Sequence, residues 1–400
     1  MSEKKCLGAD PLQIVCFCHL RWNFVYQRPQ HLLTRFGQQG PVHLWEEPLF
    51  EDRGTPGLAI EEIDGGVRVI TPLLPHGLSE EEILSSQRNL LDEYLREHQV
   101  ESYVAWYYTP MALRFSDHLA PKVIVYDCMD ELSAFQGAPP ELIKQEQRLF
   151  GKADVVFTGG ASLYAAKSTQ HKNVHLFPSS IDYAHFAIAR TQQSDPVDQA
   201  TIPYPRIGFF GVLDERFDRD LMRDLAAVHP EWRFIMIGPV VKIRQEDLPT
   251  GPNLYYLGQK SYKELPTYLA NWDVAILPFA LNASTRFISP TKTPEYLAAG
   301  KPVVSTPIQD VVKPYGEMGL VRIGANAAQF GRAIEECLNG ATDEWREDVD
   351  RFLVLNSWDK TFEGMWKEIQ RCMPQGREST AVGTEVVGTE VFEGGVKANV

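Results

Sequence analysis

Short, continuous runs of apolar residues alternate with amphipathic stretches along most of this chain, and this alternation limits the possible folds more than any other feature. The first half contains apolar runs of strand length at residues 13–18, 42–45, 67–70, 103–106, 123–126, 155–157 and 174–177. The segments between them show the apolar spacing of helices, at 26–37, 80–98, 141–152 and 162–170. Strands that are apolar throughout and separated by helices are typical of parallel sheets covered on both faces. The pattern therefore predicts an α/β fold.

The same alternation starts again at Arg206, with apolar runs at 207–210, 234–237, 253–257, 274–277 and 303–305. The chain has 400 residues, which is more than one hydrophobic core normally supports. We therefore predict two Rossmann-like domains, 1–188 and 206–356, joined by a polar linker at 189–205. The Gly-punctuated near-repeat in the last segment predicts a disordered tail at 373–400.

Composition excludes several classes of protein. The chain carries 39 Lys and Arg against 53 Asp and Glu, and the resulting charge of −14 argues against nucleic acid as a partner. No apolar run approaches the roughly 18 residues that a membrane span requires. Six scattered cysteines do not suggest a disulfide framework, and the N-terminus lacks the apolar core of a secretory signal. We expect a cytoplasmic protein.

Two glycine turns in the second half suggest a phosphate site. Gly211 ends the apolar run at 207–210, and Gly238 ends the next one, shortly before Lys242. Ligands in open α/β sheets bind beyond the carboxyl ends of the strands, where helix N-termini attract phosphate. A plain tight turn explains either glycine alone, but the repetition and the nearby cation favour phosphate binding.

The segment from Arg286 to Ser305 carries the strongest signal. It reads RFISPTKTPEYLAAGKPVVS, and a helix is expected to begin near Thr291, with Ser289 just before it. Free amides at that helix start, together with Lys292 and Arg286, would suit a diphosphate. Glu295 lies in the first turn, where it could accept hydrogen bonds from sugar hydroxyls. The alternative is that Glu295 only favours the helix dipole and that both cations are solvated.

Four segments of the chain resemble a known family. The segments SPTKTPEYLAAGKPVVSTP, FFGVLDERFDRDL, NLYYLGQKSYKELPTYLANWDVAILPF and HLFPSSIDYAHF look like those of GT-B glycosyltransferases. The likeness is greatest to the bacterial group-1 enzymes of exopolysaccharide, teichuronic-acid and xanthan-type assembly, and it covers roughly residues 12–371.

The resemblance implies a GT-B fold, in which the C-terminal domain binds a nucleotide sugar and the N-terminal domain binds the acceptor. It also implies that the final helix, 357–371, returns to the N-terminal domain. Glu295 matches the second carboxylate of the family's E-x7-E signature, which would hold the ribose. The first carboxylate falls on Phe287, a departure that places the signature's usual retaining mechanism in doubt.

Carboxylates follow the apolar run at 123–126 and are candidates for a general base. Asp127, Asp130 and Glu131 lie at the expected carboxyl end of a strand, where a base could project into the cleft. Asp130 is the first choice, although Asp127 and Asp130 could also simply cap the following turn.

A second group of candidates would contact the acceptor or line the cleft. His19, Trp22 and Arg28 follow the first predicted strand, and aromatic faces with Arg forks suit sugar rings and anionic groups. Trp106 and Tyr107, at another strand end, fit the acceptor side and the core equally well. Packing of Trp22 against the start of the helix is the alternative for that residue.

These observations predict a glycosyltransferase that moves a sugar from a nucleoside diphosphate, UDP favoured over GDP, to a saccharide, lipid-linked or other hydroxyl acceptor. No cofactor and no metal are expected, because cations and helix amides would neutralise the diphosphate and because Asp218-Arg219-Asp220 is better explained as a helix start. A lipid-linked acceptor would add peripheral contact with the inner face of the membrane. The alternatives are a non-hydrolysing sugar-nucleotide epimerase and a degenerate scaffold that binds a partner transferase.

Overall fold

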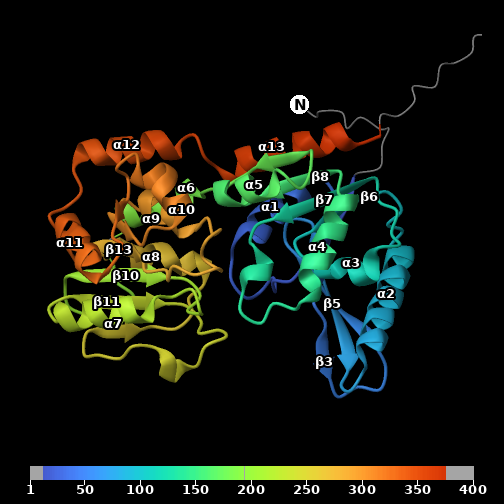
Figure 1. The fold of residues 1–400 in the computed structure, drawn as a ribbon, viewed down its shortest axis with the longest axis horizontal. Helices are drawn as coiled ribbons and strands as arrows, with labels where there is room; N and C mark the ends of the chain where they lie inside the picture. The colour runs from blue at the N-terminus through green and yellow to red at the C-terminus, as the bar shows by residue number, and fades with distance from the viewer. Residues whose placement is uncertain (1–11, 193, 375–400) are drawn as a thin grey trace, which may run out of the picture.

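The apolar runs form the central strands of two separate sheets in the computed structural model (Figure 1). The structure describes residues 12–192 and 194–374. Most of the tail predicted at 373–400 therefore lies outside the described residues. Within the described ranges, no helix is both long enough and apolar enough to cross a bilayer.

The N-terminal sheet has nine strands in the order β3-β5-β2-β1-β6-β7-β8-β9, with β4 paired to β5. Only the β4–β5 pair is antiparallel. The strands are β1 (Gln13–Cys18), β2 (Val42–Glu46), β3 (Leu49–Glu51), β4 (Gly57–Ile63), β5 (Val67–Pro75), β6 (Tyr103–Tyr107), β7 (Val123–Cys128), β8 (Val155–Thr158) and β9 (Val174–Leu176).

Helices cover both faces of this sheet, as its apolar strands require. Side chains of α1 (Arg28–Gly37) and α13 (Trp358–Cys372) pack in one core cluster, on one face. Those of α2 (Glu80–Glu97), α3 (Leu113–Ser116), α4 (Glu141–Lys152) and α5 (Ala161–Lys167) pack in a second cluster.

The C-terminal sheet has six parallel strands in the order β12-β11-β10-β13-β14-β15. They are β10 (Arg206–Phe210), β11 (Arg233–Ile237), β12 (Leu254–Tyr256), β13 (Val274–Leu277), β14 (Val303–Ser305) and β15 (Arg322–Ile323). The helices of this half are α6 (Tyr183–Ala187), α7 (Arg219–Val228), α8 (Leu265–Ala270), α9 (Lys292–Ala298), α10 (Gln309–Val311), α11 (Ala327–Leu338) and α12 (Asp343–Leu353).

The junction between the domains lies earlier than the sequence suggests. Ile181 and Phe186 are buried in the core of the C-terminal domain, although they precede the predicted boundary at 188. Within the segment expected as a linker, 189–205, Gln199 is fully buried in the same domain and accepts a hydrogen bond from the Trp272 indole. Gln199 also donates to the Tyr268 carbonyl, so this part of the segment is fixed to the domain and is not a free spacer.

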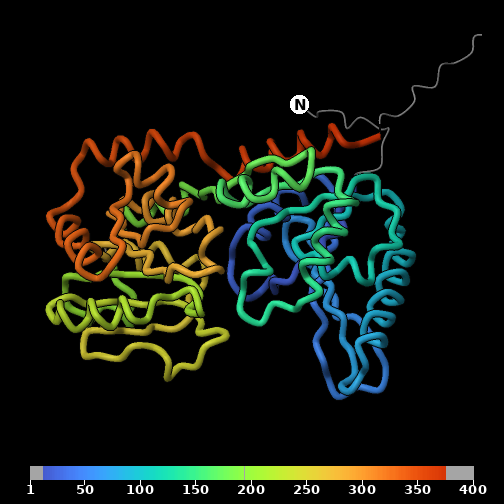
Figure 2. The backbone as a smooth tube through the Cα atoms, viewed as in Figure 1, coloured from blue at the N-terminus to red at the C-terminus, as the bar shows by residue number. Residues whose placement is uncertain are grey.

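Helix α13 carries the chain back to the N-terminal domain. It contacts α1, β7 and β8, and it buries Trp358, Met365 and Ile369. Figure 2 shows both crossings, the first in green after β9 and the second in red before α13. The two domains are thus connected twice.

Candidate active site

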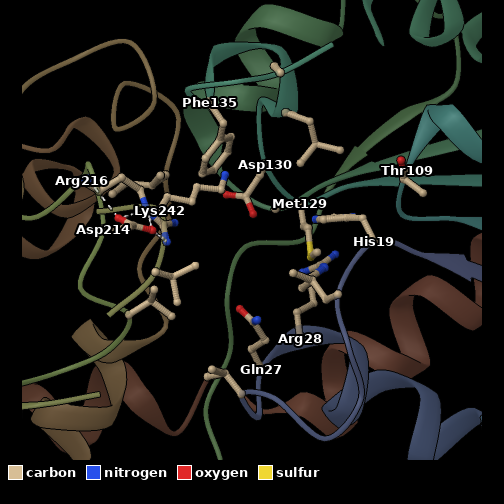
Figure 3. Close-up of a pocket in the computed structure, with 18 of the residues that line it drawn as sticks. His19, Gln27, Arg28, Thr109, Met129, Asp130, Phe135, Asp214, Arg216 and Lys242 are labelled. Atoms are coloured by element: carbon tan, nitrogen blue, oxygen red, sulfur yellow. Dashed lines mark hydrogen bonds and ion pairs between the residues drawn. The ribbon is translucent and has the colours of Figure 1, made fainter. Parts of the chain in front are cut away.

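A cavity of about 570 Å³ lies between the two domains, at the carboxyl ends of both sheets. Residues that follow β1, β6 and β7 line it from one side, and residues that follow β10 and β13 or begin α9 line it from the other. Figure 3 shows His19, Arg28 and Asp130 facing Asp214, Arg216 and Lys242 across this space. The site therefore combines residues far apart in the sequence.

The start of α9 forms one wall of the cavity. Ser289, Thr291 and Lys292, which the sequence predicts as diphosphate ligands, all line it, and Lys292 is the first residue of the helix. Burial lowers the pKa of Lys292, while the negative charge of Glu295 opposes that change. A cation and the first amides of a helix thus meet at one point, which suits an anionic ligand.

Two glycines let the strand ends approach this wall. A Cβ atom on Gly211 would lie 2.8 Å from Cε of Lys292, and one on Gly238 would clash with the Gly211 carbonyl oxygen. Gly211 does not itself line the cavity. Its role is to leave room for the Lys292 side chain, so both turns are required for close packing.

Asp214 and Arg216 are cavity residues that the sequence reasoning missed. The Arg216 guanidinium donates to Asp214 Oδ2 at 2.6 Å, and the Arg216 backbone amide donates to Oδ1 at 2.9 Å. They occupy the loop after β10, so the strand-end rule that selected Gly211 could have found them.

Lys242 reaches the cavity from the loop after β11. Its backbone has φ +61°, an uncommon conformation for a residue with a side chain. Its ammonium nitrogen lies 5.0 Å from the centre of the Phe135 ring, which belongs to the opposite domain. Backbone strain of this kind is concentrated at functional sites.

Glu295 is buried just behind the cavity wall. Its exposure is 7%, and it does not line the cavity. Burial raises the pKa of its carboxyl to about 7, although Lys292 acts in the opposite direction. Burial makes the ionised form of this carboxylate costly, and hydrogen bonds from ligand hydroxyls would stabilise that form.

Of the three candidate bases, Asp130 lines the cavity. It lies in the turn after β7, where its carbonyl oxygen accepts a hydrogen bond from the Cys128 thiol. Burial raises the pKa of its carboxyl, and the positive charges of Arg216, Lys292 and Arg28 oppose this effect. A half-buried carboxylate facing the cleft has the position that a general base needs.

Asp127 does not face the cleft. It is fully buried and forms an ion pair with Arg28, whose Nη2 lies 2.8 Å from Oδ1. The Arg28 Nη1 donates to the Phe177 carbonyl at 2.8 Å, so Arg28 lines the cavity with its nitrogens already engaged. The pair connects α1 to β7, and removing either partner would leave a buried charge.

Glu131 points away from the cavity into a buried network. Its carboxylate pairs with Lys167 at 2.7 Å and also accepts a hydrogen bond from Ser133. Lys167 also pairs with Glu146 at 2.9 Å, and Glu146 accepts a bond from the Tyr126 hydroxyl. Glu131 therefore anchors the loop that carries Asp130 instead of reaching the cleft.

The remaining predicted residues divide between the cavity and the core. His19 lines the cavity, with its Nδ1 buried and unpartnered among the described residues, and burial together with Lys242 lowers its pKa to about 4. Trp106 and Tyr107 are buried in β6, so of their two alternatives the core is right and the cleft is wrong. Trp22 packs on the N-terminal core, and Arg286 is exposed over the Phe287 ring outside the cavity.

The D-x-D sequence is part of a helix start, as expected. Asp218 is the N-cap of α7, and its side chain accepts a hydrogen bond from the Leu221 amide at 2.9 Å. Its carboxylate is therefore committed to the helix.

Two facing α/β domains with a cleft at the carboxyl ends of their parallel sheets define the GT-B fold. The E. coli structure described as trehalose-6-phosphate bound with UDP-2-fluoro glucose superposes with a TM-score of 0.66 at 12% identity, covering 91% of this chain and 100% of that one. A UDP-forming trehalose-phosphate synthase from Burkholderia xenovorans, in complex with glucose-6-phosphate, superposes with a TM-score of 0.63 at 12% identity. That superposition covers 90% of this chain and 100% of the synthase.

Residues 204–340 match the family model "Glycosyl transferases group 1". TuaH of Bacillus subtilis (strain 168), named for teichuronic acid biosynthesis as a glycosyltransferase, is 25% identical over 284 residues, or 66% of this chain and 70% of that protein. The fold is therefore GT-B, and the chain is a glycosyltransferase whose residues 204–340 are similar to the group-1 family.

Proposed function

We propose that this glycosyltransferase uses a nucleoside-diphosphate sugar, a UDP sugar in preference to a GDP sugar, and transfers the sugar to a hydroxyl group without a metal ion. The observation that carries the proposal is the convergence of Lys292, Lys242 and Arg216 at the start of α9. A diphosphate leaving group gains negative charge as the glycosidic bond breaks, and preorganised cations stabilise that charge. Arg216 replaces Arg286, which we had expected in this set from the sequence.

The donor's sugar and ribose would lie on either side of this diphosphate site. Glu295, one turn into α9, would accept hydrogen bonds from the ribose hydroxyls. Asp130, across the cleft, would accept the proton of the attacking hydroxyl. We favour UDP because the E. coli protein of the same fold has been solved with UDP-2-fluoro glucose.

A calorimetric panel of UDP, GDP and their sugars, with and without EDTA, tests the proposal. UDP should bind more tightly than GDP, and EDTA should change neither binding nor turnover. Lys292→Ala should reduce turnover more than it reduces donor affinity, because its contact strengthens as the bond breaks. Arg286→Ala is a matched control outside the cavity and should leave both unchanged. Loss of turnover in EDTA that Mg²⁺ restores would contradict metal independence.

A further inference from the structure

A buried carboxylate of the C-terminal domain contacts the N-terminal domain outside the cavity. Asp310 belongs to α10, which follows β14, and only 5% of the residue is exposed. Its Oδ1 accepts a hydrogen bond at 3.0 Å from the backbone amide of Ser162, which lies in α5 of the other domain. Asp310 does not line the cavity, so any effect on the reaction must pass through the residues that it holds.

The burial of this carboxylate is costly. Its second oxygen, Oδ2, has no hydrogen-bond partner among the described residues. Burial raises the pKa of the Asp310 carboxyl, and the hydrogen bonds from Ser162 and Ala161 oppose this effect. A buried carboxylate oxygen without a partner destabilises a fold. Stability alone therefore does not account for an aspartate at this position.

The turn between β8 and α5 leaves room for this carboxylate. A Cβ atom on Gly160 would clash with Asp310 Oδ2 and would lie 2.9 Å from Cβ of Ser289. Gly160 has φ −167°, an extended conformation that any residue adopts, so its own backbone does not require a glycine. The glycine is required because two segments of the C-terminal domain, at Ser289 and at Asp310, approach it closely.

On the C-terminal side, this contact adjoins the start of α9. Ser289 lines the cavity and precedes Lys292 by three residues. Its carbonyl oxygen accepts a hydrogen bond at 2.7 Å from the Ser179 hydroxyl, which belongs to the first crossing between the domains. The segment 289–292 is therefore held against the N-terminal half of the chain at two points.

On the N-terminal side, the same contact adjoins the turn that carries Asp130. The Gly159 amide donates to the Cys128 carbonyl at 2.9 Å. A Cβ atom on Gly159 would lie 2.7 Å from the carbonyl oxygen of Met129, the residue before Asp130. A shift of the turn at 159–162 would therefore be transmitted to Asp130.

We propose that Asp310 is a positioning residue, which docks the turn at 159–162 onto the segment 289–292 and so sets the distance between Asp130 and Lys292. The parts that Asp130 and Lys292 take in the reaction rest on the proposed function, whereas the docking contact does not. When base and leaving group are held by different domains, their alignment depends on how the domains meet. A misplacement of about 1 Å can lower a rate by about 10²-fold.

Hydrogen exchange and small-angle X-ray scattering of the full chain test the docking. Asp310→Ala should speed exchange of the amides in 161–167 by about fivefold, the usual effect of losing a side chain that accepts from a helix amide. It should also speed exchange in 128–136 and 286–292 and increase the radius of gyration. Asp310→Asn keeps an acceptor oxygen and should restore most of the protection.

Gly160→Ala makes the same test from the other domain. Its added Cβ should push the carboxylate away and reproduce the exchange pattern of Asp310→Ala. The two changes should not be additive, because the clash with Oδ2 disappears when the carboxylate is absent. Asn326→Ala is the matched control, since Asn326 accepts from the Gln329 amide at the start of α11 within one domain. It should leave exchange in 161–167 and the radius of gyration unchanged.

Faster exchange confined to 161–167, with an unchanged radius of gyration, would reduce Asp310 to a local cap of α5 and overturn the proposal. Unchanged exchange in both the Asp310→Ala and Gly160→Ala proteins would overturn it as well. A UDP titration of the unmodified chain separates these results from the proposed function. If UDP does not bind but the exchange pattern is as expected, the donor site is wrong and the docking contact stands.

Discussion

The Phe135 ring of the N-terminal domain lies over the Lys242 ammonium group of the C-terminal domain, 5.0 Å from ring centre to nitrogen. The Arg216 guanidinium carbon lies 5.3 Å from the same ring. One aromatic side chain thus contacts two of the three cations that we assign to the donor diphosphate, and it does so across the cleft (Figure 3). A diphosphate that binds these cations has to compete with the ring.

Phe135→Ala should therefore strengthen the binding of UDP. A cation–π contact at a partly exposed site contributes about 0.5–1 kcal/mol, so the gain should be roughly two- to fivefold by calorimetry. Phe50→Ala, at an exposed aromatic position of β3 outside the cavity, is the matched control and should have no effect. Weaker binding in the Phe135 variant would mean that the ring contacts the nucleotide directly.

Glu295→Gln should have opposite effects on stability and on ligand binding. The pKa of Glu295 is about 7 in the folded chain against an ordinary value of 4.5, so the native state holds a proton that the unfolded state releases between these values. Stability therefore falls as the pH rises from 4.5 through 7. The glutamine variant escapes this loss and should be more stable at pH 8, by up to about 3 kcal/mol, and about equally stable near pH 4.5.

Nucleotide binding provides the second measurement on the same variant. In the proposed site, ribose hydroxyls would donate to the ionised carboxylate of Glu295, so the affinity of the unmodified chain for UDP should rise between pH 6 and 8. In Glu295→Gln that rise should disappear, and UDP affinity at pH 8 should fall by about 1–3 kcal/mol. A pH-independent affinity in both proteins would remove Glu295 from the ribose site.

Glu131→Gln tests whether the buried Lys167 network positions Asp130. Losing the ion pair should loosen the loop and lower kcat, without changing UDP affinity. The informative comparison is a double-mutant cycle: in an Asp130→Asn background, Glu131→Gln should cost nothing further, because it acts through Asp130. Asp195→Asn, which breaks the pair with Arg206 in the other domain, should lower the melting temperature alone. Equal losses of kcat in both Asp130 backgrounds would reduce Glu131 to a structural residue.

The central strands could be predicted from the sequence because a short, continuous apolar run between two helices is stable mainly as a strand buried on both faces. It missed β3 and β4, whose residues include the exposed Leu49, Phe50 and Ile60. Strands at a sheet edge bury little and leave no clear apolar pattern. Burial also decides the position of Trp106. Strand β6 is paired on both sides and covered on both faces, so even its carboxyl end lies in the core.

The location of the site could be predicted from the sequence, but the sequence did not distinguish the residues that line the cavity from neighbours that do not. Asp127 and Asp130 look alike beside a strand end, yet Asp127 is still within β7 and pairs with Arg28, 99 positions away. Arg286 and Lys292 flank the same motif, and only the course of the chain between them turns one to solvent and the other to the cavity. Such choices depend on tertiary contacts, which carry no local signal.

The reaction's stereochemistry is the most demanding prediction. The first carboxylate of the E-x7-E signature is replaced by Phe287, which packs against the N-terminal core, while Asp130 faces the cavity with a raised pKa. This arrangement favours a single displacement with inversion, in which Asp130 takes the proton of the acceptor hydroxyl as that hydroxyl attacks the anomeric carbon opposite the diphosphate.

Asp130→Asn should then reduce kcat by about 10²- to 10⁴-fold and leave UDP affinity intact. Because a base acts only when ionised, kcat of the unmodified enzyme should fall as the pH drops through the raised pKa of Asp130, and the asparagine variant should lose this dependence. In a retaining reaction the departing phosphate can accept the proton on the same face, so no such base is required. Proton NMR of the product, read against the anomeric configuration of the donor, separates the two routes: retention would leave Asp130 as a residue of the turn after β7 and nothing more.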